Sequence, residues 1–180
     1  METHELRAHR TANPEAPSKV TARLTGLDKR WLTMRWRLDN PGPIAVPAFA
    51  GNARTDGLWQ TTCFEFFVRS DDGDAYSEFN FSPSEQWAAY DFTAYREGMR
   101  ERVVPRAPVC TWRPGSTFAI FDVALPTAAL PALPASIALT AVIEQQDGAK
   151  SYWATAHPPG QPDFHDPACF TIRLEAPLAS

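Results

Sequence analysis

Apolar and polar residues alternate in short runs along most of the chain, and turn-forming residues separate these runs from residue 18 onward. In residues 32–38, leucine, methionine and tryptophan alternate with threonine and arginine, which is typical of a half-buried strand. No segment keeps a helical stripe of apolar residues over three turns. The pattern therefore indicates an all-β protein. It predicts further strands at residues 20–25, 103–112, 117–125, 137–144, 150–157 and 169–174.

The regular spacing of these short strands also predicts how they pack. The chain has 180 residues, enough for one core, and its 17 prolines cluster between the apolar runs as loop residues do. We therefore expect one antiparallel β-sandwich of two sheets, immunoglobulin-like or jelly-roll, with roughly nine to eleven strands over residues 18–180. Residues 1–17 are polar and are expected to form a flexible N-terminal segment.

Residues 58–92 carry the strongest strand signal in the chain. Two aromatic-rich runs flank the sequence SDDGD at residues 70–74, whose residues tolerate positive φ angles, so the runs predict a hairpin. The apolar side chains of both strands must point to the same side, because a slip by one residue would bury the polar set instead. The predicted core face carries Thr62, Phe64, Phe66, Val68, Ser77, Phe79 and Phe81.

The opposite face of this hairpin is the predicted ligand site. It combines aromatic rings with carboxyl and amide groups, which suit the apolar and hydroxyl faces of a sugar ring. An ordinary solvated sheet face with scattered exposed aromatics is the alternative interpretation. The candidate binding residues on this face are Trp59, Glu65, Tyr76, Glu78 and Asn80, beside Thr61, Cys63, Phe67 and Ser82.

A third strand is expected at residues 86–92, and its orientation is ambiguous from the sequence. Either Trp87, Ala89 and Asp91 or the intervening residues could face the core. We expect Ala88, Tyr90 and Phe92 to face inward, because that set is the more apolar and requires no buried carboxylate.

Charge and cysteine content narrow the function classes. The net charge of −4, with no run of lysine or arginine, indicates neither nucleic acid nor an anionic membrane as a partner, so a small-molecule ligand is expected. The N-terminus lacks the apolar stretch of a signal peptide and no later stretch is long enough to span a membrane, so a cytoplasmic location is predicted. Cys63, Cys110 and Cys169 lie in apolar-aromatic segments and are expected to be buried free thiols.

Three stretches of the chain resemble a known family: LWQTTCFEFFV at residues 58–68, YSEFNFSPSEQWAAYDF at 76–92 and SYWATAHPPGQPDFH at 151–165. They are similar to bacterial DOMON-like proteins, which are relatives of family-nine carbohydrate-binding modules. The resemblance spans most of the chain and implies a β-sandwich that binds sugar or haem on one sheet, rather than an enzyme. It also implies work outside the cell, which differs from the cytoplasmic prediction.

The resemblance implies roles for particular residues. In the sugar-binding modules a Trp six residues before a Glu supplies one wall of the site and a hydrogen-bonding carboxylate, and Trp59 and Glu65 have that spacing. A second Trp near the C-terminal strands closes the other wall, and Trp153 lies in the corresponding region. The Asn expected beside it is absent, because Ser151, Tyr152 and Thr155 surround Trp153 here.

The proline-rich loop HPPGQPDFHDP offers a second group of candidate residues. His157, Asp163 and His165 are candidate metal ligands, although their spacing matches no standard metal motif and side chains of these types also satisfy turn backbone groups. No cofactor is expected; for the haem alternative, the axial ligands would be His157 or His165 with Met99. We also place His157 in the predicted ligand site.

A catalytic alternative rests on two acidic residues. Glu65 and Glu78, on one sheet face, could serve as the acid and nucleophile of a glycosidase, which requires carboxyl groups about 5 to 9 Å apart. Nearly any two acids on the same face of neighbouring strands meet that requirement. The sequence contains no nucleophile elbow, glycine-rich phosphate loop or HExxH motif, so a non-catalytic binding domain is the preferred interpretation.

Overall fold

The computed structural model describes residues 2–12 and 14–176, and within them it forms twelve strands and three short 3₁₀ helices. No helix in these residues is long and apolar enough to cross a membrane. The strands are β1 (His4–Ala8), β2 (Lys19–Leu27), β3 (Trp31–Asp39), β4 (Cys63–Ser70), β5 (Tyr76–Phe81), β6 (Trp87–Phe92), β7 (Arg100–Glu101), β8 (Val109–Arg113), β9 (Phe118–Pro126), β10 (Ala135–Glu144), β11 (Lys150–Ala154) and β12 (Ile172–Leu174). The 3₁₀ helices are η1 (Leu58–Gln60), η2 (Thr127–Ala129) and η3 (Pro167–Cys169).

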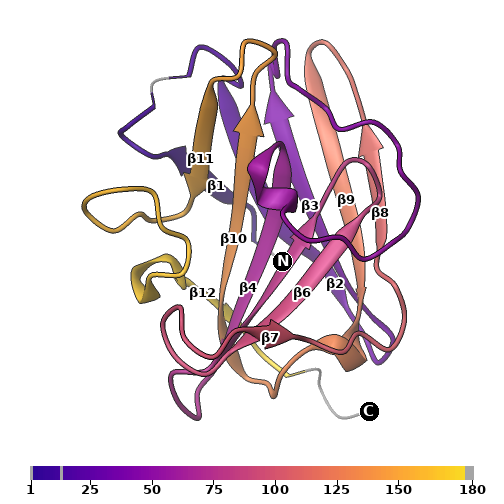
Figure 1. Ribbon diagram of the computed structural model, residues 1–180, viewed down its shortest axis with the longest axis vertical. Coiled ribbons are helices and arrows are strands. Elements are labelled where there is room, and N and C mark those ends of the chain that lie inside the picture. Colours follow the sequence, from indigo (N-terminus) through magenta and orange to yellow (C-terminus); the bar gives the residue numbers. More distant parts are fainter. Residues whose placement is uncertain (1, 13, 177–180) are drawn as a thin grey trace.

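The strands form one continuous antiparallel sheet that curls onto itself (Figure 1). Its order is β7-β6-β5-β4-β10-β11-β1-β2-β3-β9-β8, and β12 pairs with β10 beside this path. The predicted all-β class is confirmed. The two separate sheets of the expected sandwich are instead two halves of one sheet, and the strand number exceeds the expected nine to eleven because β1 and β7 add to it.

Strand β1 joins the two halves of the sheet. Glu5 pairs with Thr21 of β2, and Arg7 pairs with Ala154 of β11. Residues 4–8 therefore form a strand within the segment 1–17, for which the sequence predicted flexibility. The sequence gives little sign of this strand, because only Leu6 in it is fully buried. Backbone hydrogen bonds to β2 and β11 hold it in place.

The two halves of the sheet enclose the main core. Trp36 of β3, Phe64 of β4 and Phe121 of β9 meet there, with ring centroids 5.6 Å apart for Trp36 and Phe64 and 4.3 Å apart for Phe64 and Phe121. The core face predicted for β4 and β5 is confirmed, because Phe64, Phe66, Val68, Phe79 and Phe81 all lie fully buried in this cluster.

The expected orientation of β6 is wrong. Trp87 and Ala89 lie in the main core, whereas Tyr90 and Phe92 lie on the other side of the sheet, which we call the outer face. The register requires this, since Phe79 of β5 pairs with Ala89 and Glu78 pairs with Tyr90. Neighbouring residues directly opposite each other in a sheet point to the same face.

Asp91 can point to the core side of the sheet because its carboxylate has hydrogen-bond partners there. Ser77 Oγ donates to Asp91 Oδ1 at 2.8 Å, and Arg102 Nη1 donates to the same oxygen at 2.6 Å. A partly buried carboxylate with these two partners does not carry the cost of an unpaired charge. Strand β6 can therefore present its aromatic side chains to the outer face.

A second apolar cluster lies on the outer face, where residues 155–171, which we call the C-terminal loop region, pack against the sheet. Phe67 of β4 and Tyr76 of β5 contact Phe170 edge to face, with ring centroids 6.1 and 5.9 Å apart. Phe164 and the thiol of Cys169 are buried in the same cluster. The prediction of free, buried cysteines is confirmed for Cys63, Cys110 and Cys169.

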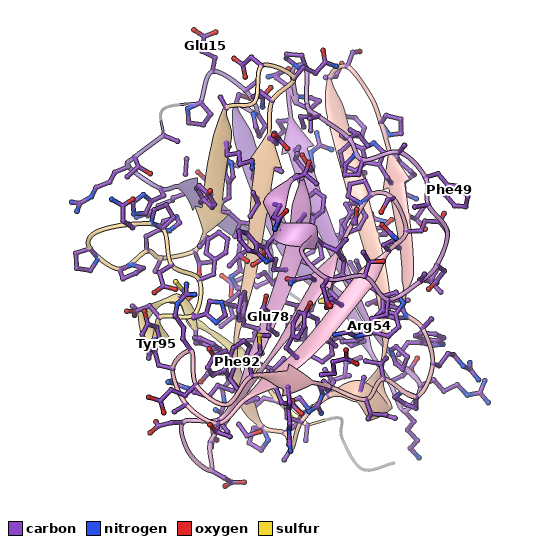
Figure 2. All side chains as sticks on the ribbon, viewed as in Figure 1. Glu15, Phe49, Arg54, Glu78, Phe92 and Tyr95 are labelled. Carbon is purple, nitrogen blue, oxygen red and sulfur yellow. The ribbon has the colours of Figure 1, made fainter. Side chains whose placement is uncertain are left out.

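Substitution of Phe64 by alanine tests the central role of the main core. Because Phe64 is fully buried between both halves of the sheet, we expect Phe64→Ala to lower the free energy of unfolding by about 3–5 kcal/mol. Phe49 is 74% exposed and lies at the periphery of the molecule (Figure 2), so Phe49→Ala should change it by less than about 0.5 kcal/mol. Urea unfolding followed by tryptophan fluorescence measures both; equal effects would contradict this assignment.

Candidate functional site

A pocket of about 1000 Å³ opens on the outer face, beside the second apolar cluster. Its floor comes from the strands β4, β5, β6, β10 and β11. Its walls come from Thr11 and from residues 54–59, 96–101 and 161–165, of which Arg100 and Glu101 form β7. The outer face is therefore covered only in part, and the loops that cover it also deepen the pocket. This volume lies at the upper end of the range typical of small-molecule sites.

Two carboxyl groups lie side by side in the pocket floor. Glu65 of β4 pairs across the sheet with Asn80 of β5 on one side and with Thr140 of β10 on the other. Asn80 Nδ2 donates to Glu78 Oε1 at 2.8 Å, and Thr140 Oγ1 donates to Glu65 Oε2 at 3.5 Å. Asn80 Oδ1 is buried and has no hydrogen-bond partner among the described residues.

The two carboxyl groups differ in pKa. Burial raises the pKa of Glu65 well above its usual value, and the neighbouring Glu78 raises it further. Burial also raises the pKa of Glu78, but the Asn80 amide and the nearby Arg96 oppose this, and the result is about 7. Near neutral pH, Glu65 therefore keeps its proton and can donate a hydrogen bond, whereas Glu78 is the carboxyl that loses its proton first as the pH rises.

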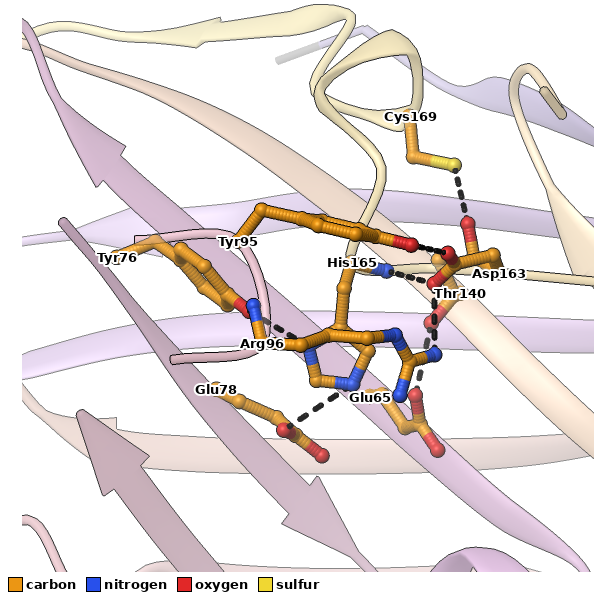
Figure 3. A network of polar contacts seen from close by, with 9 residues as sticks. All are labelled: Glu65, Tyr76, Glu78, Tyr95, Arg96, Thr140, Asp163, His165 and Cys169. Atoms are coloured by element: carbon orange, nitrogen blue, oxygen red, sulfur yellow. Dashed lines mark hydrogen bonds and ion pairs between the residues drawn. The ribbon is translucent and has the colours of Figure 1, made fainter. Parts of the chain in front are cut away.

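His165 extends this polar network into one wall of the pocket (Figure 3). The backbone N–H of Arg96 donates to the Tyr76 hydroxyl at 3.2 Å, and this hydroxyl lies 2.7 Å from His165 Nδ1. The Tyr76 hydroxyl and His165 Nδ1 thus share one hydrogen bond, and His165 Nε2 lies 3.7 Å from Glu78 Oε2. Burial and the charge of Arg96 lower the pKa of His165 to about 4, so the ring is neutral.

Asp163 holds the wall segment in place. Arg96 Nη2 donates to Asp163 Oδ1 at 2.8 Å, and the Tyr95 hydroxyl donates to Asp163 Oδ2. The backbone N–H of His165 donates to Asp163 Oδ1 at 3.1 Å, and the Cys169 thiol donates to the Asp163 carbonyl at 3.3 Å. These contacts join the segment at residues 161–165 to the turn before β7 (Figure 3).

Aromatic side chains complete the floor and the walls. Tyr90 and Phe92 of β6, Tyr152 of β11 and Phe164 line the pocket between the polar groups. Trp59 lines the mouth from η1 and is 54% exposed, although the sequence analysis expected it on a strand. The chain enters η1 through Gly57, whose φ of 75° favours glycine.

The structure brings most of the predicted site residues together. Trp59, Glu65 and Glu78 line the pocket. Tyr76 and Asn80 are buried beneath it and act through lining residues, since Tyr76 contacts His165 and Asn80 contacts Glu78.

Trp153 and His157 lie elsewhere. Trp153, expected as the second aromatic wall, is buried in the main core, where its Nε1 donates to Ser151 Oγ at 2.8 Å. Adjacent residues of a strand point to opposite faces, so Tyr152 lines the pocket in its place. His157 is also outside the pocket lining, and its Nε2 contacts the Arg7 carbonyl at 2.8 Å.

The metal alternative finds no support in this geometry. Among the described residues, no three His, Cys, Asp or Glu side chains converge to hold a metal ion, because Asp163 is paired with Arg96 and His157 contacts Arg7. Met99 and His165 do line the same pocket. His165 Nδ1 lies 2.7 Å from the Tyr76 hydroxyl, whereas Nε2 is 3.7 Å from Glu78 Oε2, beyond hydrogen-bond distance.

Sequence reasoning missed several lining residues. Tyr90 and Phe92 were assigned to the wrong face, and Tyr152 was overlooked beside the more prominent Trp153. Their correct faces follow from strand pairing, since Tyr90 lies opposite Glu78 and Tyr152 lies opposite Val142. Arg54 comes from an irregular loop and had no periodic signal in the sequence.

Comparisons with known proteins show similarity of fold only. No protein-family model and no curated protein sequence matches the chain. A crystal structure of a candidate carbohydrate-binding protein from Bacteroides uniformis is similar over 94% of this chain and 84% of its own, with a TM-score of 0.64 and 18% identity. A family-nine carbohydrate-binding module from Caldicellulosiruptor kristjanssonii, in complex with glucose, matches over 83% of this chain and 73% of its own, with a TM-score of 0.44 and 10% identity. The chain thus shares its fold with the Bacteroides protein.

The raised pKa of Glu78 predicts a pH-dependent stability difference. Its pKa is about 7 in the folded protein against 4.5 ordinarily, so ionisation destabilises the fold progressively from about pH 4.5 to 7. Relative to wild type, Glu78→Gln should gain on the order of 2–3 kcal/mol in unfolding free energy across this range and stay level above it. The lowered pKa of His165 acts in the opposite direction below pH 6.5, so the difference between variant and wild type is the quantity to compare.

Chemical denaturation at a series of pH values measures this difference. The control is Glu175→Gln, because the Glu175 side chain is 71% exposed and its replacement should alter stability little at any pH. If the difference in unfolding free energy between Glu78→Gln and wild type stays constant from pH 4.5 to 7, the Glu78 carboxyl titrates normally.

Proposed function

We propose that this protein binds a small carbohydrate in the outer-face pocket and does not transform it chemically. The observation that carries the proposal is the composition of the floor: Glu65, which keeps its proton and can donate, lies beside Glu78, whose oxygen already accepts from Asn80 and which loses its proton more readily. Sugar hydroxyls both donate and accept, so adjacent groups of opposite hydrogen-bonding character suit a diol.

The aromatic walls support the same class of ligand. Sugar rings carry apolar C–H faces that pack on aromatic rings, while their hydroxyl groups require polar partners. The pocket combines both, with Tyr90, Tyr152 and Phe164 around the floor and Trp59 at the mouth. Its depth comes from loops fixed by Asp163 and His165, so the ligand meets a largely preformed site.

Removal of the Trp59 ring tests the proposal. If this exposed ring packs on the sugar, Trp59→Ala should weaken binding by about five- to tenfold, the loss of roughly 1 kcal/mol of ring contact. Phe49→Ala removes an exposed aromatic that does not line the pocket and should leave affinity unchanged. Isothermal titration of hexoses, pentoses and disaccharides into both variants and wild type provides the measurement. Absence of binding to every sugar by the wild-type protein would refute the proposal.

Glycoside hydrolysis is the second candidate function. The observation favouring it is that two neighbouring carboxyls in a pocket differ in proton affinity, as the acid and the ionised group of a glycosidase do. In that case Glu65 would protonate the leaving oxygen and Glu78 would act as nucleophile or base. Glu78 is however already hydrogen-bonded to Asn80, an arrangement that equally serves a bound hydroxyl.

Activated aryl glycosides distinguish the two functions. A hydrolase should release the phenol at a rate that Glu65→Gln and Glu78→Gln each reduce at least about a hundredfold. A binding protein should release none, while titration with the corresponding sugar still yields heat. Turnover in wild type that both variants abolish would replace the binding proposal with the catalytic one.

A further inference from the structure

The two carboxyl groups in the pocket floor have no lysine or arginine partner among the described residues. Glu65 accepts from Thr140, and Glu78 accepts from Asn80 and lies beside the neutral ring of His165 (Figure 3). Buried acids are normally paired with a cation, because an unpaired buried charge is costly. The floor therefore lacks a positive charge that its two acids could use.

The arginines that line the pocket do not supply this charge. Each of them has another acid within ion-pair distance. The pairs are Arg54 with Asp56, Arg96 with Asp163, and Arg100 with Asp91. The positive charges of the walls are thus matched by acids other than those of the floor.

Each floor carboxyl also keeps one oxygen free for a ligand. Glu65 Oε1 and Glu78 Oε2 accept no hydrogen bond from the described residues, since Thr140 and Asn80 use the other two oxygens. Both side chains line the pocket. Neither free oxygen is fully enclosed, in contrast to the buried Asn80 Oδ1. A ligand in the pocket can therefore reach both oxygens.

The other ionisable groups around the floor are neutral near pH 7 or are already paired. Burial raises the pKa of the Cys63 thiol and of the Tyr90 hydroxyl, and burial lowers the pKa of His165 to about 4. Arg96 is charged but is held by Asp163. In the free protein, protons on the two floor carboxyls therefore take the place of a cation.

The shape and lining of the pocket suit a ligand that carries an ammonium group. A primary ammonium has three N–H donors, enough to bond both free carboxyl oxygens at once. Phe92, Tyr152 and Phe164 line the pocket, and aromatic rings attract a nearby cation. The volume of about 1000 Å³ also leaves room for a sugar ring around that group.

We infer that the preferred ligand is an amino sugar in its ammonium form, with the ammonium group between Glu65 Oε1 and Glu78 Oε2 and the sugar ring against the aromatic side chains. This inference rests on the proposed function and adds the chemical class of the sugar. When the ammonium binds, the floor carboxyls give their protons to solvent, and the resulting carboxylates accept hydrogen bonds from it. A neutral sugar leaves those protons in place.

Calorimetric titration of the wild-type protein gives the first test. Glucosamine or galactosamine should bind at least about tenfold more tightly than glucose and galactose, because charge-assisted hydrogen bonds are the stronger ones. N-acetylglucosamine is the matched control, since it keeps the ring and lacks the charge. Cyclohexylamine supplies an ammonium without hydroxyls and should bind more weakly than the amino sugar. Tighter binding of either control than of both amino sugars would overturn the inference.

Proton release gives the second test. Near pH 6 the Glu78 carboxyl is mostly protonated in the free protein, because its pKa is about 7. Binding of an amino sugar should release protons, so its apparent enthalpy should differ between phosphate and MES buffers, whereas that of glucose should not. Affinity for the amino sugar should rise from about pH 5 to 7, as the carboxyls lose their protons more easily. Tight binding without proton release would place the ammonium elsewhere and overturn the inference.

Variants of the floor give the third test. Glu65→Gln and Glu78→Gln should each remove most of the preference for amino sugars while neutral sugars still bind, because an amide keeps the shape and carries no charge. The control is Glu175→Gln, which removes an exposed carboxylate outside the pocket lining and should leave the preference unchanged. Melting temperature and circular dichroism show whether each variant is folded, and the comparisons on wild type stand without any variant.

The outcomes separate the inference from the proposed function. Equal affinity of wild type for amino sugars and neutral sugars would overturn the inference and leave carbohydrate binding intact. Failure of wild type to bind any charged or neutral sugar would overturn the proposed function together with the inference. An amino sugar preference that persists in both folded floor variants would contradict the assignment of Glu65 and Glu78.

Discussion

The alternation of side chains along β4 and β5 is the constraint on which the other features of this protein depend. Both strands are buried on both faces, because the second half of the sheet covers one face and the C-terminal loop region covers part of the other. Phe64, Phe66, Phe79 and Phe81 therefore point to the main core, which leaves Glu65, Glu78 and Asn80, together with Phe67, on the outer face. The polar floor forms because every second residue of β4 and β5 points to the main core, and the residues between them point to the outer face.

Burial of that floor determines its chemistry. A carboxyl group on a solvated sheet would be ionised at neutral pH and would offer only acceptors. Here the partial cover over the outer face raises the pKa of both carboxyls, and the contacts of Asn80 and Arg96 make them unequal. The same loops that reduce the exposure of the floor also carry His165 and Phe164, so wall and floor depend on each other.

Sequence reasoning succeeded wherever strand periodicity was strong and both faces were distinct. It located the hairpin of β4 and β5, its core face, and three of the pocket-lining residues, Trp59, Glu65 and Glu78. It failed for β6, where both faces are apolar enough to be buried and the deciding contact, Asp91 with Arg102, comes from a residue outside the strand.

The remaining misses have related causes. Trp153 was favoured over Tyr152 because ring size was weighed without strand pairing, and pairing with Ala141 places Trp153 in the core. The pocket walls at residues 54–59 and 161–165 are irregular, and their positions follow from long-range contacts such as that between Asp163 and Arg96. No local pattern encodes contacts of that kind.

The connection through β1 has a consequence for how the molecule behaves among other copies of itself. Two separate sheets would present four strand edges, each a row of backbone groups able to pair with another chain. The single curled sheet presents two along its main path, β7 and β8, and β7 is only two residues long. Strand β8 ends in an exposed arginine and is followed by Pro114, both of which disfavour further pairing. By joining the two halves of the sheet, β1 leaves two strand edges along the main path where two separate sheets would have four.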